Sequence, residues 1–201
     1  MNNNVTRGHG LLEGFLANQR IKVANKLIID KHRQGKLLDI GCGSYPLFLT
    51  KVEFSQKYGL DKMVKAEQIE TLKNQNINLI NYDSEENQNL PFEDNFFDVV
   101  TMLAVFEHIE PAKLPNLLKE IKRILKPNGI YILTTPAVWT DGLLRFLAKL
   151  NLVSPAEIQE HKDAYSHKKI AQFLTKAEFE QEKLQFGYFE LFMNIWATAT
   201  K

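Results

Sequence analysis

The stretch Leu37-Leu38-Asp39-Ile40-Gly41-Cys42-Gly43 decides the fold, because it is a short apolar strand that runs into two glycines. Glycine lets the backbone approach a ligand closely, and the helix N-terminus that follows such a turn favours an anionic group. Gly-x-Gly also occurs in many loops that bind nothing. Taken alone, this element therefore fits a plain tight turn as well as it fits a ligand-binding loop.

Strand-like and helix-like segments alternate on both sides of this element. Short apolar runs predict strands at residues 36–40, 57–60, 77–82, 97–105 and 130–135. Apolar residues at helical spacing predict helices at residues 64–74, 114–125 and 166–177, with one or two more within 11–32. The alternation predicts an α/β fold built on a doubly wound, mainly parallel sheet.

The region near the C-terminus departs from this rhythm. The strand at residues 97–105 is almost continuously apolar, as expected of a strand covered on both faces, and a turn is expected at Pro127-Asn128-Gly129. Residues 178–189 and 191–200 are expected to form an antiparallel hairpin around Gly187.

The length of 201 residues suits one α/β domain. We divide it into N-terminal helices, a core, an inserted lid, and a C-terminal helix with a strand hairpin, at residues 1–34, 36–135, 138–165 and 166–201. The formal charge of +1 gives no reason to expect nucleic acid as a partner, and no apolar run approaches the ~18 residues of a membrane span. A single cysteine and a polar N-terminus favour the cytoplasm. The sequence does not predict the oligomeric state.

Two acidic residues end predicted strands. Asp61 follows the second strand, where a carboxylate can accept hydrogen bonds from both hydroxyls of a ribose. Asp83 closes the third strand and could accept a bond from an adenine amino group, while the amide of Ser84 faces a ring nitrogen. Both aspartates could instead cap a helix or a turn, and the two roles can coexist.

The segment Leu90–Val100, LPFEDNFFDVV, resembles a block found in class I methyltransferases of the small-molecule type, which use S-adenosylmethionine (SAM). Leu38–Gly43 before it, and Glu107-His108 and Leu125–Gly129 after it, extend the likeness. The resemblance covers residues 36–135 firmly and the remainder in outline.

The resemblance implies a seven-stranded sheet with an antiparallel last strand, and SAM bound across the carboxyl ends of the first four strands. Gly41 and Gly43 would hold the methionine end, Asp61 the ribose, and Leu103 would lie beside the sulfonium. The full set of cofactor residues expected on this basis is Asp39, Gly41, Cys42, Gly43, Asp61, Lys62, Asp83, Ser84 and Leu103.

Two positions depart from the family pattern. The glycine loop usually has a third glycine where this chain has Tyr45, followed by Pro46, so the role of Tyr45 at the methionine end is open. Certain quinone-type O-methyltransferases bind a metal through a glutamate three residues before the Glu-His pair. That position is Ala104 here, so the sequence predicts no catalytic metal.

Methyl transfer is an in-line displacement, and a hydroxyl nucleophile benefits from a positioned base. The candidates are His108, which follows the fourth strand, and His161 with Tyr165, which share one face if the lid is helical there. A structural histidine and a solvated helix end are the alternatives. Trp139, Leu143, Leu144 and Phe146 could line an acceptor pocket or simply pack, and Arg7–Gly10 and Arg20 could contact an anionic substrate or form surface charge.

The sequence thus predicts methyl transfer from SAM to a small or medium-sized acceptor, with oxygen favoured as the acceptor atom. A protein that binds SAM without catalysis is an alternative. A nicotinamide-dependent oxidoreductase is disfavoured because Pro46 stands where its fingerprint needs a third glycine. Methylation of nucleic acid or protein is disfavoured because Leu103-Ala104-Val105-Phe106 replaces the motif typical of those enzymes.

Overall fold

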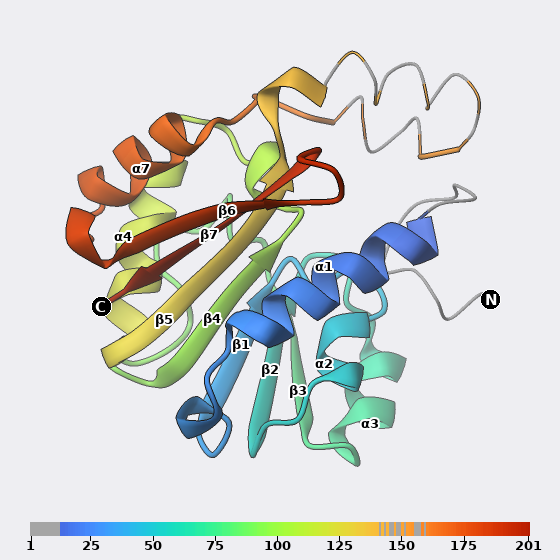
Figure 1. Ribbon diagram of the computed structural model, residues 1–201. Coiled ribbons are helices and arrows are strands. Elements are labelled where there is room, and N and C mark those ends of the chain that lie inside the picture. The colour runs from blue at the N-terminus through green and yellow to red at the C-terminus, as the bar shows by residue number, and fades with distance from the viewer. Residues whose placement is uncertain are drawn as a thin grey trace.

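The computed structural model describes residues 13–140, 142, 144, 147, 150, 152–154, 158 and 160–201. A seven-stranded sheet forms the centre, with helices on both faces (Figure 1). The strands are β1 (Lys36–Ile40), β2 (Gln56–Asp61), β3 (Ile77–Asn81), β4 (Phe97–Leu103), β5 (Leu125–Pro136), β6 (Leu184–Phe189) and β7 (Asn194–Thr200). The α-helices with described bounds are α1 (Glu13–Leu27), α2 (Leu47–Lys51), α3 (Ala66–Lys73), α4 (Leu114–Ile124) and α7 (His167–Lys176).

The strand order is β3-β2-β1-β4-β5-β7-β6. The first five strands in this order are parallel, whereas β7 lies antiparallel between β5 and β6. The structure therefore confirms the predicted doubly wound sheet with an antiparallel last strand. The chain reverses its direction of winding between β1 and β4, and ligands of such sheets bind outside the carboxyl ends of the strands at this switch point.

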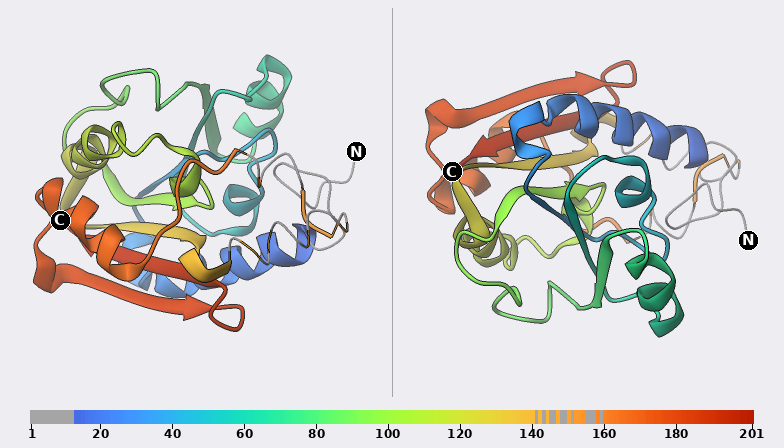
Figure 2. Two further views of the ribbon diagram at one scale, coloured as in Figure 1. Left: turned by 90° about the horizontal axis from the view of Figure 1, so that it is seen from above. Right: turned by 90° about the horizontal axis from the view of Figure 1, so that it is seen from below.

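Alternating side chains of the central strands build two apolar cores, one on each face of the sheet. Leu37, Val99 and Ile132 pack with α1, α2 and α3, while their neighbours Leu38 and Val100 pack with α4 and α7. Figure 2 shows α1 on one side of the sheet and α4 and α7 on the other. Burial on both faces explains why these strands are apolar without alternation.

The loop that contains Leu90–Asp94, between β3 and β4, is fixed to α4 by Arg123. Arg123 donates to the carbonyl oxygens of Phe92 (2.9 Å) and Leu90 (3.2 Å), and to Asp94 (2.7 Å) and Glu120 (2.7 Å). A planar guanidinium can make all of these bonds at once, which a lysine cannot. This arginine therefore anchors the loop that leads into the central strand β4.

The hairpin near the C-terminus differs from the prediction. Gly187 lies inside β6, where a Cβ atom would come within 2.4 Å of the Trp196 ring, so it allows close packing rather than a turn. The turn lies at residues 190–193, and β6 begins only at Leu184 because a 3-10 turn at Gln181–Lys183 precedes it. The turn expected at 127–129 is likewise part of β5, which begins at Leu125.

Candidate functional site

A cleft of about 500 Å³ opens at the carboxyl ends of the central strands. A volume of this size is typical of sites for small molecules and cofactors. All nine residues that the sequence predicts to bind the cofactor line it, together with Ala104, Val105, His108 and Ile109 after β4 and with residues of α1. The parallel sheet brings these residues together because each follows the end of a neighbouring strand.

The glycine loop after β1 has a backbone that only glycine adopts easily. Gly41 and Gly43 both have a φ of +76°, in the left-handed region. A Cβ atom on Gly41 would also lie 2.4 Å from the Val105 side chain, so the loop and the end of β4 are in direct contact. Cys42, between the glycines, is buried, and burial raises the pKa of its thiol well above the usual value, which makes it unreactive.

Asp61, at the end of β2, holds this loop in place. One carboxylate oxygen accepts the backbone N–H of Gly43 at 2.9 Å, and the other accepts that of Met63 at 2.7 Å. A carboxylate oxygen can accept two hydrogen bonds, so each retains capacity for a ligand hydroxyl. Asp61 therefore acts as a structural cap and still offers two acceptors to the cleft.

Asp83, after β3, is an ionised acceptor at the opposite end of the cleft. It accepts the backbone N–H groups of Glu85 (2.9 Å) and Glu86 (3.3 Å), and the Lys62 ammonium lies 3.5 Å away. Burial alone would raise the pKa of Asp83, but these amides and the ammonium outweigh burial and hold its pKa below the usual value. The turn-cap role and a ligand role are compatible here, as the sequence suggested.

Asp39 forms the floor of the cleft. It is 4% exposed, and its carboxylate accepts a short hydrogen bond of 2.6 Å from the Thr101 hydroxyl. Burial raises the pKa of Asp39 to about 7, despite that bond. The group is therefore poised between its neutral and charged forms near physiological pH.

One end of the cleft lies beyond β4, and we call it the acceptor end because the sequence predicts the methyl acceptor there. His108 lines it, and the His161 ring contacts the His108 ring with 5.0 Å between centroids. The backbone N–H of Lys162 donates to the Glu107 carbonyl at 2.8 Å, which fixes residues 160–162 against the end of β4. The two predicted histidines are thus adjacent, although many residues separate them in the chain.

Tyr165 does not reach the cleft, and the helix on which its candidacy depended is absent. Residues 161–164 have no helical structure, and Tyr165 forms a β-bridge with Ala137. Its side chain has 0% exposure and packs against Phe106 with 4.7 Å between ring centroids. The spacing of His161 and Tyr165 was misleading because Tyr165 pairs with Ala137, after β5, and does not lie on a helix.

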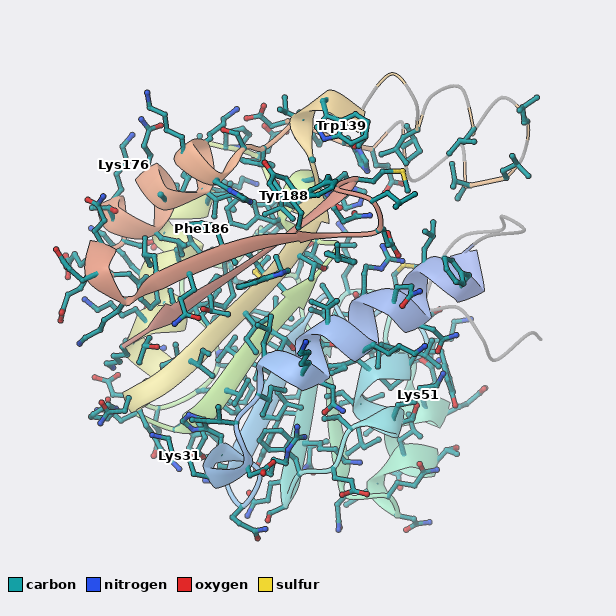
Figure 3. All side chains as sticks on the ribbon, viewed as in Figure 1. Lys31, Lys51, Trp139, Lys176, Phe186 and Tyr188 are labelled. Carbon is teal, nitrogen blue, oxygen red and sulfur yellow. The ribbon has the colours of Figure 1, made fainter. Side chains whose placement is uncertain are left out.

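The proposed acceptor-lining aromatics also differ from expectation. Trp139 is 56% exposed and donates its ring N–H to the Phe192 carbonyl at 3.1 Å, which places it by Tyr188 beside the hairpin (Figure 3). Leu144 lines a smaller hollow with Glu107 and His161. Leu143, Phe146 and Arg7–Gly10 lie outside the described residues.

α1 forms one wall of the cleft, from which the sequence named only Arg20 as a possible substrate contact. Ala17, Arg20 and Ile21 line it, and Arg20 makes no ion pair or hydrogen bond within the described part of the chain. The signal was the helical spacing that places these residues on the side that also carries the buried Ala24. The sequence left open whether Tyr45 lies at the methionine end of the cofactor site. Tyr45 is half-buried and does not line the cleft, whereas Phe48 of α2 does.

Residues 38–133 match a family model described as a methyltransferase domain. Demethylmenaquinone methyltransferase of Staphylococcus epidermidis is 30% identical over 139 residues, which make up 64% of this chain and 56% of that protein. An uncharacterized methyltransferase of Schizosaccharomyces pombe is 35% identical over 106 residues, 47% of this chain and 37% of that protein. The chain thus spans about half the length of the first relative.

Solved structures share the fold over nearly the whole chain. A SAM-dependent methyltransferase of Thermotoga maritima has a TM-score of 0.68 at 19% identity, over 93% of this chain and 89% of that one. A Haemonchus contortus phosphoethanolamine N-methyltransferase in complex with S-adenosylhomocysteine has a TM-score of 0.67 at 17% identity, over 92% and 52%. The CurJ carbon methyltransferase has 0.63 at 17%, over 92% and 55%. Proteins that methylate nitrogen and carbon share this fold, so the fold does not fix the acceptor atom.

Proposed function

We propose that this chain is a class I SAM-dependent methyltransferase, which transfers the methyl group of SAM to a small or medium-sized acceptor, preferably to oxygen. The match of residues 38–133 to a methyltransferase-domain family model supports this proposal. The supporting observation is the meeting of nine candidate cofactor residues, from the ends of four neighbouring strands, in one cleft. A cytoplasmic location belongs to the same proposal. No helix among the described residues is long and apolar enough to cross a membrane.

The proposal assigns a part of SAM to each end of the cleft. The ribose hydroxyls bind the free acceptor positions of Asp61, and the adenine lies by Asp83 and Ser84. The methionine end lies over Gly41 and Gly43, which both have a left-handed backbone. This assignment directs the methyl group toward Leu103 and His108, both of which line the cleft after β4.

SAM supplies an electrophilic methyl group on a sulfonium. The acceptor oxygen attacks the methyl carbon while the carbon–sulfur bond breaks, and S-adenosylhomocysteine leaves as a neutral thioether. The hydroxyl proton has to leave the acceptor, and His108 or His161 beside it is the proposed receiver. Residues 138–165 serve as the proposed lid, since residues 160–162 already border the acceptor end.

Calorimetric titration with S-adenosylhomocysteine tests the cofactor half of this proposal. We expect binding by the wild type and at least tenfold weaker binding by Asp61→Asn, because one charged acceptor is lost. Asp30→Asn is the matched control, since among the described residues the Asp30 side chain pairs only with Arg33 and does not line the cleft. Binding of NAD in place of S-adenosylhomocysteine would refute the assignment.

Tritiated SAM and a panel of phenols, alcohols, amines and carbon acids test the transfer itself. We expect product from a hydroxyl acceptor, with kcat reduced about 100-fold in His108→Gln and little change in the KM for SAM. Transfer only to amines or carbon would overturn the preference for oxygen. Tight binding without transfer to any member of an extended panel would favour a SAM-binding protein instead.

A further inference from the structure

Glu107, His108 and His161 form a compact cluster between the cleft, which His108 lines, and the smaller hollow, which Glu107 and His161 line. One ligand atom from each residue, a carboxylate oxygen or an imidazole nitrogen, lies within 4.8 Å of the other two. Glu107 and His108 belong to the 3-10 turn Phe106–His108 after β4, whereas His161 comes from the segment that returns over the sheet. The bond between the Lys162 N–H and the Glu107 carbonyl holds the two segments together.

One oxygen of the buried Glu107 carboxylate lacks a hydrogen-bond partner in the described part of the chain. This side chain is 2% exposed, and its Oε2 atom is buried without a hydrogen-bond partner among the described residues. Burial raises the pKa of Glu107, although His161, the Glu107 backbone, the Thr135 hydroxyl and Arg20 oppose this rise. Buried acceptors almost always have a partner, so an unpartnered carboxylate oxygen beside two imidazoles is a reason to look for a missing group.

We propose that Glu107, His108 and His161 bind a divalent transition-metal cation of the zinc or iron(II) type, which would meet the cleft on the side of His108. Two imidazoles and one carboxylate are a ligand set suited to these cations. Ligand atoms around a tetrahedral cation lie about 3.4 Å apart, so atoms up to 4.8 Å apart would have to approach one another by up to about 1.4 Å on binding.

This proposal departs from the expectation drawn from Ala104. That expectation considered only the residue one turn before the Glu-His pair, where alanine provides no ligand. The third ligand in the fold comes from His161, which no local pattern around β4 could indicate. Ala104 also has a φ of +56° and lines the cleft, so its small side chain leaves space at the acceptor end.

The role of this cation rests on the proposed function. An acceptor hydroxyl bound to an open position loses its proton to water more easily, because the cation stabilises the alkoxide. The alkoxide oxygen then forms the new bond to the methyl carbon, the carbon–sulfur bond breaks, and the cation stays on the protein. This arrangement would replace the proton transfer to a histidine proposed above: His108 and His161 would act as ligands, and the proton would pass to water.

Metal binding itself is measured first, on tag-free protein stripped with a chelator. We expect calorimetric titration with Zn²⁺ to show one site per chain, and Co²⁺ to give visible absorption bands typical of low-coordinate nitrogen and oxygen ligation. His161→Gln should weaken Zn²⁺ binding at least tenfold, and Glu107→Gln should do the same if it folds. Glu110→Gln is the matched control, because Glu110 pairs with Lys162 at 3.5 Å but is not part of the cluster.

S-adenosylhomocysteine titrations on the same samples separate this inference from the proposed function. We expect His161→Gln to bind S-adenosylhomocysteine as the wild type does while losing Zn²⁺. Equal Zn²⁺ affinity in His161→Gln and Glu110→Gln, or no Zn²⁺ binding by the wild type, would overturn the metal site. Zn²⁺ binding with loss at His161→Gln, but without S-adenosylhomocysteine binding, would support the site and refute only the methyl-transfer role.

Discussion

Asp39 should make the stability of the protein depend on pH. Its carboxyl has a pKa of about 7 in the folded protein, mainly because of burial, and an ordinary value of 3.8 otherwise. Between these values the folded protein keeps a proton that the unfolded chain releases. The free energy of unfolding therefore falls as the pH rises from about 4 to about 7, and this contribution is constant above pH 7.

Urea unfolding of the wild type and of Asp39→Asn at pH 5 and pH 8 measures this contribution. We expect the wild type to lose stability relative to the variant on going from pH 5 to pH 8, by at most about 3 kcal/mol. Other titrating groups affect both proteins equally and cancel in the comparison. A parallel pH dependence of the two proteins would show that Asp39 is ionised in the folded state throughout.

Residue-level prediction succeeded where a residue directly follows a strand. Asp61 and Asp83 could be placed in one cleft because the carboxyl ends of parallel strands share one edge of the sheet. His161 and Arg20 could not be placed in this way, because their positions depend on the path of the lid and on the angle of α1. Tyr165 was misplaced because its bridge to Ala137 is a non-local contact.

Among the elements, the loop before β4 depends on Arg123. We expect Arg123→Lys to lower the free energy of unfolding by about 2 kcal/mol, since a single ammonium cannot bond to two carboxylates and two carbonyls together. Residues 86–100 are all described and none of them lines the cleft, so the affinity for S-adenosylhomocysteine should stay unchanged. Urea unfolding and calorimetry check both parts, and a tenfold loss of affinity at unchanged stability would contradict them.

The hairpin turn is the element that the sequence failed to locate. Glu190, Leu191 and Phe192 take φ values of 51°, 54° and 68°, which non-glycine residues adopt at a cost. A search for glycine therefore pointed to Gly187, whose function is to pack against Trp196. Strands could be predicted from burial, but a turn without glycine leaves no comparable signal.

Leu191→Gly should consequently stabilise the protein, by about 0.5 to 1 kcal/mol. Leu191 is 85% exposed, so the substitution removes little packing while it relieves the left-handed backbone. Leu191→Ala is the matched control, because it shortens the same side chain but keeps a Cβ atom. Thermal unfolding of the three proteins decides the matter: equal gains from glycine and alanine would attribute the effect to the exposed side chain instead.

At the scale of the whole molecule, the side of the sheet formed by the carboxyl ends of its parallel strands (the carboxyl edge) and the side formed by their amino ends (the amino edge) have different roles. The carboxyl edge carries the cleft, whereas the amino edge is tied by charged side chains. The Lys201 ammonium donates to Asn95 and to the carbonyls of Arg123 and Leu125, and Asp98 accepts from Lys126 and from the Lys36 backbone. One edge is thus built for binding and the other for stability.

Hydrogen exchange with and without S-adenosylhomocysteine should reveal this division. We expect slower amide exchange at short labelling times in the loops after β1, β2, β3 and β4, at residues 41–44, 61–65, 83–86 and 103–109. These loops surround the cleft, and a ligand that bridges them suppresses their local opening. Residues 33–36, 95–98 and 125–129 lie at the amino edge and should exchange at the same rate in both states. Slower exchange at the amino edge alone would mean that S-adenosylhomocysteine binds elsewhere. A ligand bound at the carboxyl ends of the strands does not contact the amino edge and has no direct way to slow exchange there.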